Sequence, residues 1–294
     1  MIHISSFSAL NAYASCPYHY YLKYVAKVKA LEADYTGTFP GSCVHKAAEL
    51  FFEWKNKAGE LDYSIFGKEN IERIMQSLWD EKTMHYSENA FAANEAEALE
   101  KITLWADYLR RMIIDNGCIK PVTLSEFRWG ADSPAKVSER LLLIGGPDLC
   151  YAQSNDMPHT MIDFKNTESE LHCSDHQLML YVIATENTFN VKIPMAAFFL
   201  VKAMKPVWKV VTEDKKKATL NWAHQILDGI EANKFEPSAS KAACRLCPYR
   251  IAGCPHTAFS ETSTKTVSKI KSLKELRSEM QTTKAKVVND IPEL

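Results

Sequence analysis

The chain has 294 residues, enough for one large domain or two small ones, and its 46% hydrophobic and 24% charged residues are typical of a globular protein. No apolar run approaches the roughly 18 residues of a membrane span, and no charged N-terminal region precedes an apolar stretch. We therefore expect a soluble, cytoplasmic protein without membrane contact. Its eight cysteines are too few for a disulfide scaffold and favour a metal site.

Charge is unevenly distributed, although the net charge is only −1. Residues 46–107 hold 13 acidic and 7 basic residues, a balance of −6, whereas residues 191–250 hold 11 basic and 5 acidic residues, a balance of +6. A basic region of that size is typical of a surface that binds phosphate. A solvated lysine-rich face, including Lys215–Lys217, explains the same charge equally well.

The N-terminal part is predicted to be helical. Residues 6–25 carry apolar and aromatic residues at helical spacing, and Pro17 divides them into two short helices. Residues 41–59 predict an amphipathic helix, and residues 68–117 predict two or three more. We interpret residues 46–117 as a helical insertion that precedes the core.

After Pro121 the pattern changes to that of strands. Strands are predicted in residues 122–130, 139–153, 159–166, 194–203 and 207–211, and helices in residues 176–187 and 214–235. The turn-like composition of "SNDMP" joins the second and third strands as a hairpin. This order predicts an α/β core. Residues 259–294 are rich in Ser, Thr and Lys and are expected to form a charged, mobile tail.

The predicted hairpin carries two carboxylates. If its turn centres on residues 155–156, opposed residues have numbers that sum to 311, so Asp148 lies opposite Asp163 on the same face, roughly 5 Å away. Alternation within the strand places Lys165 on that face too, and Phe164 on the other. Paired carboxylates attract Mg²⁺, and a neighbouring lysine can position water or offset charge on a phosphate. A surface hairpin with an Asp–Lys pair remains the alternative.

These residues resemble the signature of the PD-(D/E)XK nucleases. "PD" at 147–148 precedes "DFK" at 163–165, and the RecB-like branch of that superfamily is matched by four ordered motifs: Gly41–His45, Gly145–Asp148, Asp163–Lys165 and Gln177–Tyr181. The resemblance covers about residues 1–258, interpreted as a single nuclease domain. It implies a restriction-endonuclease-like core, in which a central mixed sheet is flanked by helices.

The resemblance also implies roles for individual residues. His45, Asp148, Asp163 and the backbone carbonyl of Phe164 would hold Mg²⁺ or Mn²⁺. Lys165 would act at the attacking water, and the helix with Gln177 and Tyr181 would lie against the active site and DNA. Glu126 is a weaker candidate to face the site. The expected activity is a metal-dependent deoxyribonuclease, an exonuclease acting on DNA ends or single strands in recombination, repair or CRISPR adaptation.

Three cysteines cluster near the end of the predicted domain, at Cys244, Cys247 and Cys254. Iron–sulfur members of the same branch, of the AddB and CRISPR-adaptation types, have one cysteine before the core and three after it, which assigns Cys16 as the fourth ligand. The resemblance favours a 4Fe–4S cluster in a C-terminal cysteine clasp over residues 244–254, but spacing alone allows zinc equally. Cys43, Cys118, Cys150 and Cys173 lack partners at ligand spacing and are interpreted as buried or incidental thiols. Cys173 together with His172 and His176 could suggest a metal site, but a solvated loop is favoured.

Two other functions stay open. One is a DNA-binding or scaffold subunit of a nuclease–helicase complex with an idle nuclease site, and the other is a zinc-stapled enzyme of different chemistry. The sequence has no G-x-x-x-x-G-K-[ST] motif, so any ATP-driven unwinding requires a helicase partner. A recombination or adaptation protein is the other partner expected.

Overall fold

The computed structural model describes residues 2–29, 45, 122–125, 129–152, 158–238, 240–245, 247–251 and 254–258. The predicted helical insertion at 46–117, the predicted tail at 259–294, and Gly41 and Glu126 lie outside these residues. The chain divides into two compact units. We call Met1–Ala14 with Asp34–Lys234 the sheet unit, and Ser15–Ala33 with Phe235–Leu294 the cysteine unit. A single nuclease domain over residues 1–258 therefore stays a prediction.

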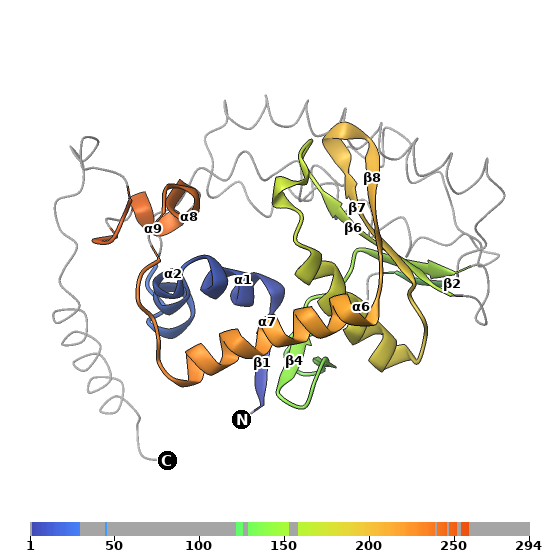
Figure 1. Cartoon of the computed structure of the whole chain (residues 1–294), viewed down its shortest axis with the longest axis horizontal. Helices are drawn as coiled ribbons and strands as arrows, with labels where there is room; N and C mark the ends of the chain where they lie inside the picture. The colour runs from blue at the N-terminus through green and yellow to red at the C-terminus, as the bar shows by residue number, and fades with distance from the viewer. Residues whose placement is uncertain are drawn as a thin grey trace, which may run out of the picture. The chain divides into compact units, whose positions relative to one another are not determined.

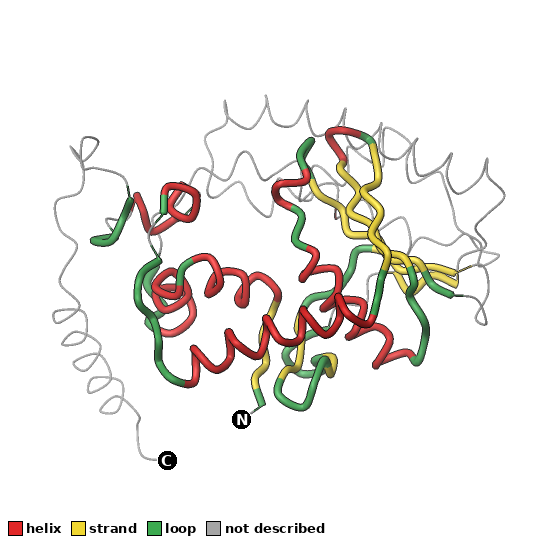
Figure 2. The backbone as a smooth tube through the Cα atoms, viewed as in Figure 1, coloured by secondary structure: helices red, strands yellow, loops and turns green. Residues whose placement is uncertain are grey.

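The sheet unit contains a five-stranded mixed sheet (Figures 1 and 2). Its strands, in spatial order, are β2 (Val122–Ser125), β5 (Leu149–Ala152), β6 (Thr160–Lys165), β7 (Met195–Leu200) and β8 (Lys205–Val210). Only β6 and β7 pair in parallel. These two strands are central and have nearly continuous buried apolar residues, as expected for strands covered on both faces. The predicted α/β fold with a mixed sheet is confirmed.

A second sheet was not predicted. It has the order β1 (His3–Ser6), β4 (Leu141–Ile144) and β3 (Ala135–Lys136), with β1 and β4 parallel. Because β1 is four residues long and pairs with a strand far along the chain, no local periodicity reveals it. Its last residue, Ser6, accepts a hydrogen bond from the amide of Ala9 at 3.2 Å and so starts α1 (Phe7–Ser15).

Two long helices position the site. In α6 (Asp175–Phe189), an unbroken run from Gln177 to Thr185 is buried, and the helix packs against α7 (Glu213–Glu231) and β3. The His176 ring stacks on Trp222 of α7 with centroids 4.5 Å apart. Short 3₁₀ turns at Glu170–His172 and Val201–Ala203 precede α6 and follow β7. No helix among the described residues has both the length and the apolarity of a membrane span.

The cysteine unit joins two distant segments of the chain. Its first segment continues from α2 (Pro17–Tyr20) into a π-helical turn, η1 (Tyr21–Val25), and its second contains α8 (Lys241–Arg245) and α9 (Pro248–Ile251). The predicted division of the N-terminal helix at Pro17 is confirmed, because Cys16 is extended, with φ −162°. The buried Tyr249 ties the segments together by donating a hydrogen bond to the Val28 carbonyl at 3.0 Å.

Gly229 of α7 lies against Tyr13 of α1. A Cβ atom there would overlap the hydroxyl of Tyr13, which donates a 2.6 Å hydrogen bond to the Lys234 carbonyl. Alanine is better than glycine by about 1 kcal/mol in a helix interior. We nevertheless expect Gly229→Ala to destabilise the protein by about 1–3 kcal/mol, because the clash outweighs helix propensity.

Urea denaturation of both glycine variants checks this expectation. Gly130→Ala is the control, since a Cβ at Gly130 meets nothing within 4 Å and should leave the transition midpoint nearly unchanged. A higher midpoint for Gly229→Ala than for the wild type would contradict the packing argument.

Candidate active site and cysteine site

The two hairpin carboxylates lie at the end of the β5–β6 ladder. Leu149 pairs with Ile162 and Tyr151 with Thr160, so opposed residue numbers sum to 311 as predicted. Asp148 immediately precedes the first of these pairs and Asp163 immediately follows its partner. The two acids are therefore neighbours across the hairpin, and both are buried, with 4% and 3% of their surface exposed.

Asp148 is held through both oxygens. Its Oδ2 accepts a 2.6 Å hydrogen bond from the backbone amide of Phe164, and its Oδ1 lies 2.8 Å from Nδ1 of His45. The Phe164 ring is buried on the opposite face of the sheet, against Phe199. The role of the Phe164 amide could not be read from the sequence, because backbone donors carry no residue-type signal. The structure thus brings the predicted His45 to Asp148.

Asp163 is held by Lys165 and by α6. Its Oδ2 forms a 2.6 Å ion pair with Nζ of Lys165, and its Oδ1 accepts a 3.2 Å hydrogen bond from Nε2 of Gln177. Gln177 Nε2 also lies 3.5 Å from the hydroxyl of Tyr181, one helical turn later. Gln177 of the predicted Gln177–Tyr181 face therefore contacts the Asp163 carboxylate directly, and Tyr181 lies next to Gln177.

A glycine shapes the approach to Asp148. Gly145 has φ +100°, a conformation that side chains rarely adopt, and its backbone pairs with Trp129 through two 2.9 Å hydrogen bonds. A Cβ on Gly145 would lie 3.7 Å from the Tyr181 hydroxyl. The first residue of the G-x-x-D motif is thus glycine because the chain turns sharply here, close to Tyr181.

The buried acids perturb one another. Burial and the nearby Asp148 carboxylate raise the pKa of Asp163 to about 6, although Lys165 acts in the opposite direction. Burial acts to lower the pKa of His45, but the Asp148 carboxylate outweighs it and the pKa is raised. Both shifts have one cause, which is negative charge confined to a site with little solvent.

The oxygen and nitrogen donors of this site suit a hard divalent cation. As they lie, no three described His, Cys, Asp or Glu side chains are arranged as a metal-binding group. At the carboxylate site, both acids are engaged with neighbouring side chains: Asp163 pairs with Lys165, and Asp148 pairs with His45. A cation would have to take over these carboxylate contacts.

Several lysines of the basic region are engaged locally. Lys216 pairs with Glu186 at 2.5 Å and with Glu213 at 2.9 Å, and Lys209 pairs with Asp175 at 3.2 Å. Lys215 donates to the Val210 carbonyl. A phosphate-binding role for residues 191–250 therefore stays a prediction, with Lys216 its least suitable member because its side chain is only 12% exposed.

Cys173, interpreted as incidental from the sequence, lies close to the carboxylate site. Burial raises its pKa, and the charges of Lys165 and Asp163 also act on it. His176, considered with it as a metal ligand, instead lies 3.0 Å from the Thr219 hydroxyl through Nδ1.

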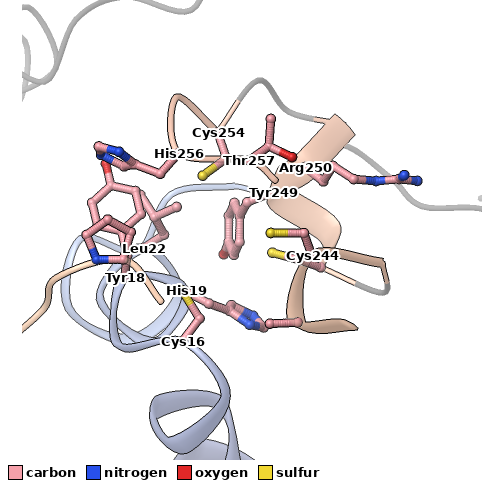
Figure 3. A pocket seen from close by; sticks show the side chains of 13 residues that line it. Cys16, Tyr18, His19, Leu22, Cys244, Tyr249, Arg250, Cys254, His256 and Thr257 are labelled. Atoms are coloured by element: carbon pink, nitrogen blue, oxygen red, sulfur yellow. The ribbon is translucent and has the colours of Figure 1, made fainter. Parts of the chain in front are cut away.

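The four predicted cluster cysteines line one pocket in the cysteine unit (Figure 3). Cys16 comes from the first segment, and Cys244, Cys247 and Cys254 come from the second. All six cysteines among the described residues are free thiols. The sequence separation of over 200 residues between Cys16 and the other three is thus closed by the fold of this unit.

Backbone amides of the second segment favour thiolates. Burial raises the pKa of Cys247 and of Cys254. Backbone hydrogen bonds from Tyr249 and Arg250 act to lower the pKa of Cys247, and one from His256 does the same for Cys254. These amide donors favour a thiolate against the effect of burial, so the donor chemistry is compatible with zinc or an iron–sulfur cluster.

Sequence comparison matches residues 5–255 to the PD-(D/E)XK nuclease superfamily. The chain belongs to this superfamily. Among solved structures, it is similar to a candidate exonuclease from Eubacterium rectale, with 15% identity, a TM-score of 0.46, and coverage of 92% of this chain and 91% of the other. It is also similar to the protein SSO0001, with 9% identity, a TM-score of 0.32, and coverage of 76% and 100%. No curated protein sequence matches it significantly.

The PD-(D/E)XK signature of this nuclease consists of Pro147, Asp148, Asp163 and Lys165. The superfamily typically uses a divalent metal and acts on nucleic acid. Three of these residues, the two acids and the lysine, meet at the end of the β5–β6 ladder, and their role as the nuclease site stays a prediction.

Asp163→Asn should stabilise the protein in EDTA at neutral pH. An unfolded aspartate titrates near pH 3.9, so a folded pKa of about 6 means that wild-type stability falls as pH rises from about 4 to 6. Asparagine has no charge to ionise, and the variant should gain about 1–3 kcal/mol above pH 6 and nothing near pH 4.

Denaturation in EDTA across this pH range measures the difference. Asp132→Asn, at an exposed aspartate, is the matched control and should follow the wild type throughout. A pH-independent gain for Asp163→Asn would mean that ionisation of this carboxyl is not its origin.

Proposed function

We propose that this protein is a metal-dependent deoxyribonuclease, an exonuclease that acts on DNA ends or single strands in recombination, repair or CRISPR adaptation. The observation that carries the proposal is the meeting of Asp148, Asp163 and Lys165 at one point of the sheet. Each acid is more than nine-tenths buried, and together they concentrate negative charge that Lys165 offsets only in part. Such a site favours a cation.

His45, Asp148, Asp163 and the Phe164 carbonyl are the residues that would hold Mg²⁺ or Mn²⁺. When bound, the cation would neutralise phosphate charge and favour ionisation of a water. The histidine is compatible with a preference for Mn²⁺. The Phe164 amide and His45 keep Asp148 oriented, and Gln177 keeps Asp163 oriented, which limits side-chain rearrangement when substrate arrives.

Lys165 has the position of a residue that acts on water and phosphate. Its ammonium lies 2.6 Å from Asp163 and 5.6 Å from the centre of the Phe198 ring, so it is held between a carboxylate and an aromatic wall. Its side chain remains 22% exposed, which leaves it accessible from solvent. A cation fixed in this way stabilises charge that develops on a phosphate without reorganisation.

Substitution of the site residues should separate metal binding from water activation. Asp148→Asn and Asp163→Asn should abolish cleavage, because each removes charge from the metal site. Lys165→Ala should still bind metal yet cleave at least about a hundredfold more slowly. His45→Ala should lose metal affinity and be partly rescued by excess Mn²⁺. Single-turnover cleavage of end-labelled DNA against metal concentration measures all four and also gives the polarity.

Binding measured in Ca²⁺ distinguishes loss of catalysis from loss of substrate. All four variants should retain DNA affinity there, because most phosphate contacts lie elsewhere. Wild-type cleavage in EDTA, or a wild-type rate in Asp163→Asn, would refute a metal-dependent site at these residues. DNA binding without cleavage by the wild type at any Mg²⁺ or Mn²⁺ concentration would instead favour the scaffold subunit.

We also propose that Cys16, Cys244, Cys247 and Cys254 hold one 4Fe–4S cluster, with zinc as the alternative. The shared pocket and the amide donors at Cys247 and Cys254 support a metal bound by thiolates. Four thiolates fit either metal, and the resemblance to iron–sulfur nucleases favours the cluster.

Cys16→Ala should lose iron, sulfide and the visible absorbance of the protein together, and should lower the thermal midpoint. One missing ligand opens the cluster, and the link between the two segments is then lost. Iron and sulfide analysis, with zinc measured in parallel, checks the result. Cys173→Ser is the control, because this thiol lies in the sheet unit and should leave metal content unchanged. Full iron in Cys16→Ala would exclude Cys16 as a ligand.

A further inference from the structure

A ladder of aromatic rings runs along the cysteine unit. Starting at Tyr18, ring centroids are 5.9 Å apart to Tyr21, 5.4 Å on to Phe235, 6.3 Å on to Tyr20 and 5.1 Å on to Tyr24. All five rings are only partly buried. Tyr18 also lines the pocket of the cysteines, whereas the other four rings line neither that pocket nor the carboxylate site, so their partial exposure needs another explanation.

The ladder rests on an irregular helix. The turn Tyr21–Val25 is π-helical, which widens the backbone locally and fixes the positions of Tyr20, Tyr21 and Tyr24. Such turns cost stability and occur frequently at functional sites. The buried Leu22 lines the pocket of the cysteines, as does Tyr18 at the start of the ladder.

Basic residues outnumber acidic residues in the two segments that carry these rings. Residues 15–29 and 235–258 contain six basic residues, Lys23, Lys27, Lys29, Lys241, Arg245 and Arg250, against the single acid Glu236. Lys23, Lys27 and Lys29 are exposed, and Nζ of Lys23 lies 5.2 Å from the centre of the Tyr24 ring. Lysines therefore border the aromatic ladder along the same short segment.

We propose that the ladder of Tyr18, Tyr20, Tyr21, Tyr24 and Phe235, with Lys23, Lys27 and Lys29, binds single-stranded DNA. Half-exposed rings offer faces on which unpaired bases stack, and the lysines neutralise the phosphates between them. A duplex has its bases already stacked and presents only phosphates. The inference rests on the proposed nuclease function and deepens it, because it makes a single strand the substrate that the protein holds.

Fluorescence anisotropy with a labelled oligothymidylate tests the ladder in full-length protein carrying Asp163→Asn, in EDTA, so that no cleavage intervenes. Tyr20→Leu with Tyr24→Leu should weaken binding by at least about tenfold, since each base–ring stack contributes substantially to affinity. Tyr20→Phe with Tyr24→Phe keeps both rings and should bind like the parent. The thermal midpoint verifies that each variant is folded.

The lysines should be visible in the salt dependence. Each of Lys23→Gln and Lys27→Gln should reduce the slope of log affinity against log salt by about 0.7, the value for one phosphate of a single strand. Lys136→Gln, an exposed lysine of the sheet unit that pairs with Glu139, should leave the slope unchanged.

Three outcomes would overturn the inference. Parent-like affinity in the folded double Leu variant would show that the rings do not bind DNA. An equal loss of affinity for a duplex of matched length would exclude stacking on unpaired bases. Tighter binding of an RNA oligomer of the same length than of the DNA oligomer would assign the surface to RNA. Because these measurements need no turnover, they are independent of whether wild-type protein cleaves DNA, and failure of the nuclease assay alone would leave the binding result intact.

Discussion

The proximity of two buried carboxylates, Asp148 and Asp163, is the constraint on which the rest of the site depends. Each would be costly to bury ionised, and their mutual repulsion adds to that cost. Hydrogen-bond donors and positive charge offset this cost: His45 and the Phe164 amide contact Asp148, and Lys165 and Gln177 contact Asp163. The pKa of Asp163 is nevertheless raised, so these contacts offset the cost of ionising Asp163 only in part.

The scaffold holds this unfavourable arrangement because rigid elements meet there. The β5–β6 ladder fixes the acids, the parallel pairing of β6 with β7 buries the strand that carries Asp163 and Lys165, and α6 is buried along most of its length. Gly145, three residues before Asp148, takes a backbone conformation open to few residues, and a Cβ there would lie against the hydroxyl of Tyr181. The stability of the sheet and helices thus offsets the local cost of burying two neighbouring carboxylates at the proposed active site.

The turn-like composition of residues 154–158 was enough to predict the hairpin, and strand alternation then places Asp163 and Lys165 on one face, because a slip of one residue would turn Asp163 into the opposite face. The register of Asp148 with Asp163 and the face shared by Gln177 and Tyr181 follow from such local periods. What the sequence could not give depends on distant pairing or on the backbone: β1, the amide of Phe164, and the capture of Lys216 by Glu186 and Glu213. These have no local signature, so charge counts alone misjudge a residue such as Lys216.

The cysteine unit has only a small hydrophobic core. Among its described residues, only Leu22, Cys244 and Tyr249 are buried and apolar. So small a core rarely holds two chain segments together without a covalent or metal link. Joining Cys16 to Cys244 closes a loop of more than 200 residues, and restricting the unfolded chain in this way is worth on the order of 5 kcal/mol. The same scarcity of burial leaves the aromatic ladder half exposed, so a bound metal would also be what keeps those rings in place for a strand to stack on them.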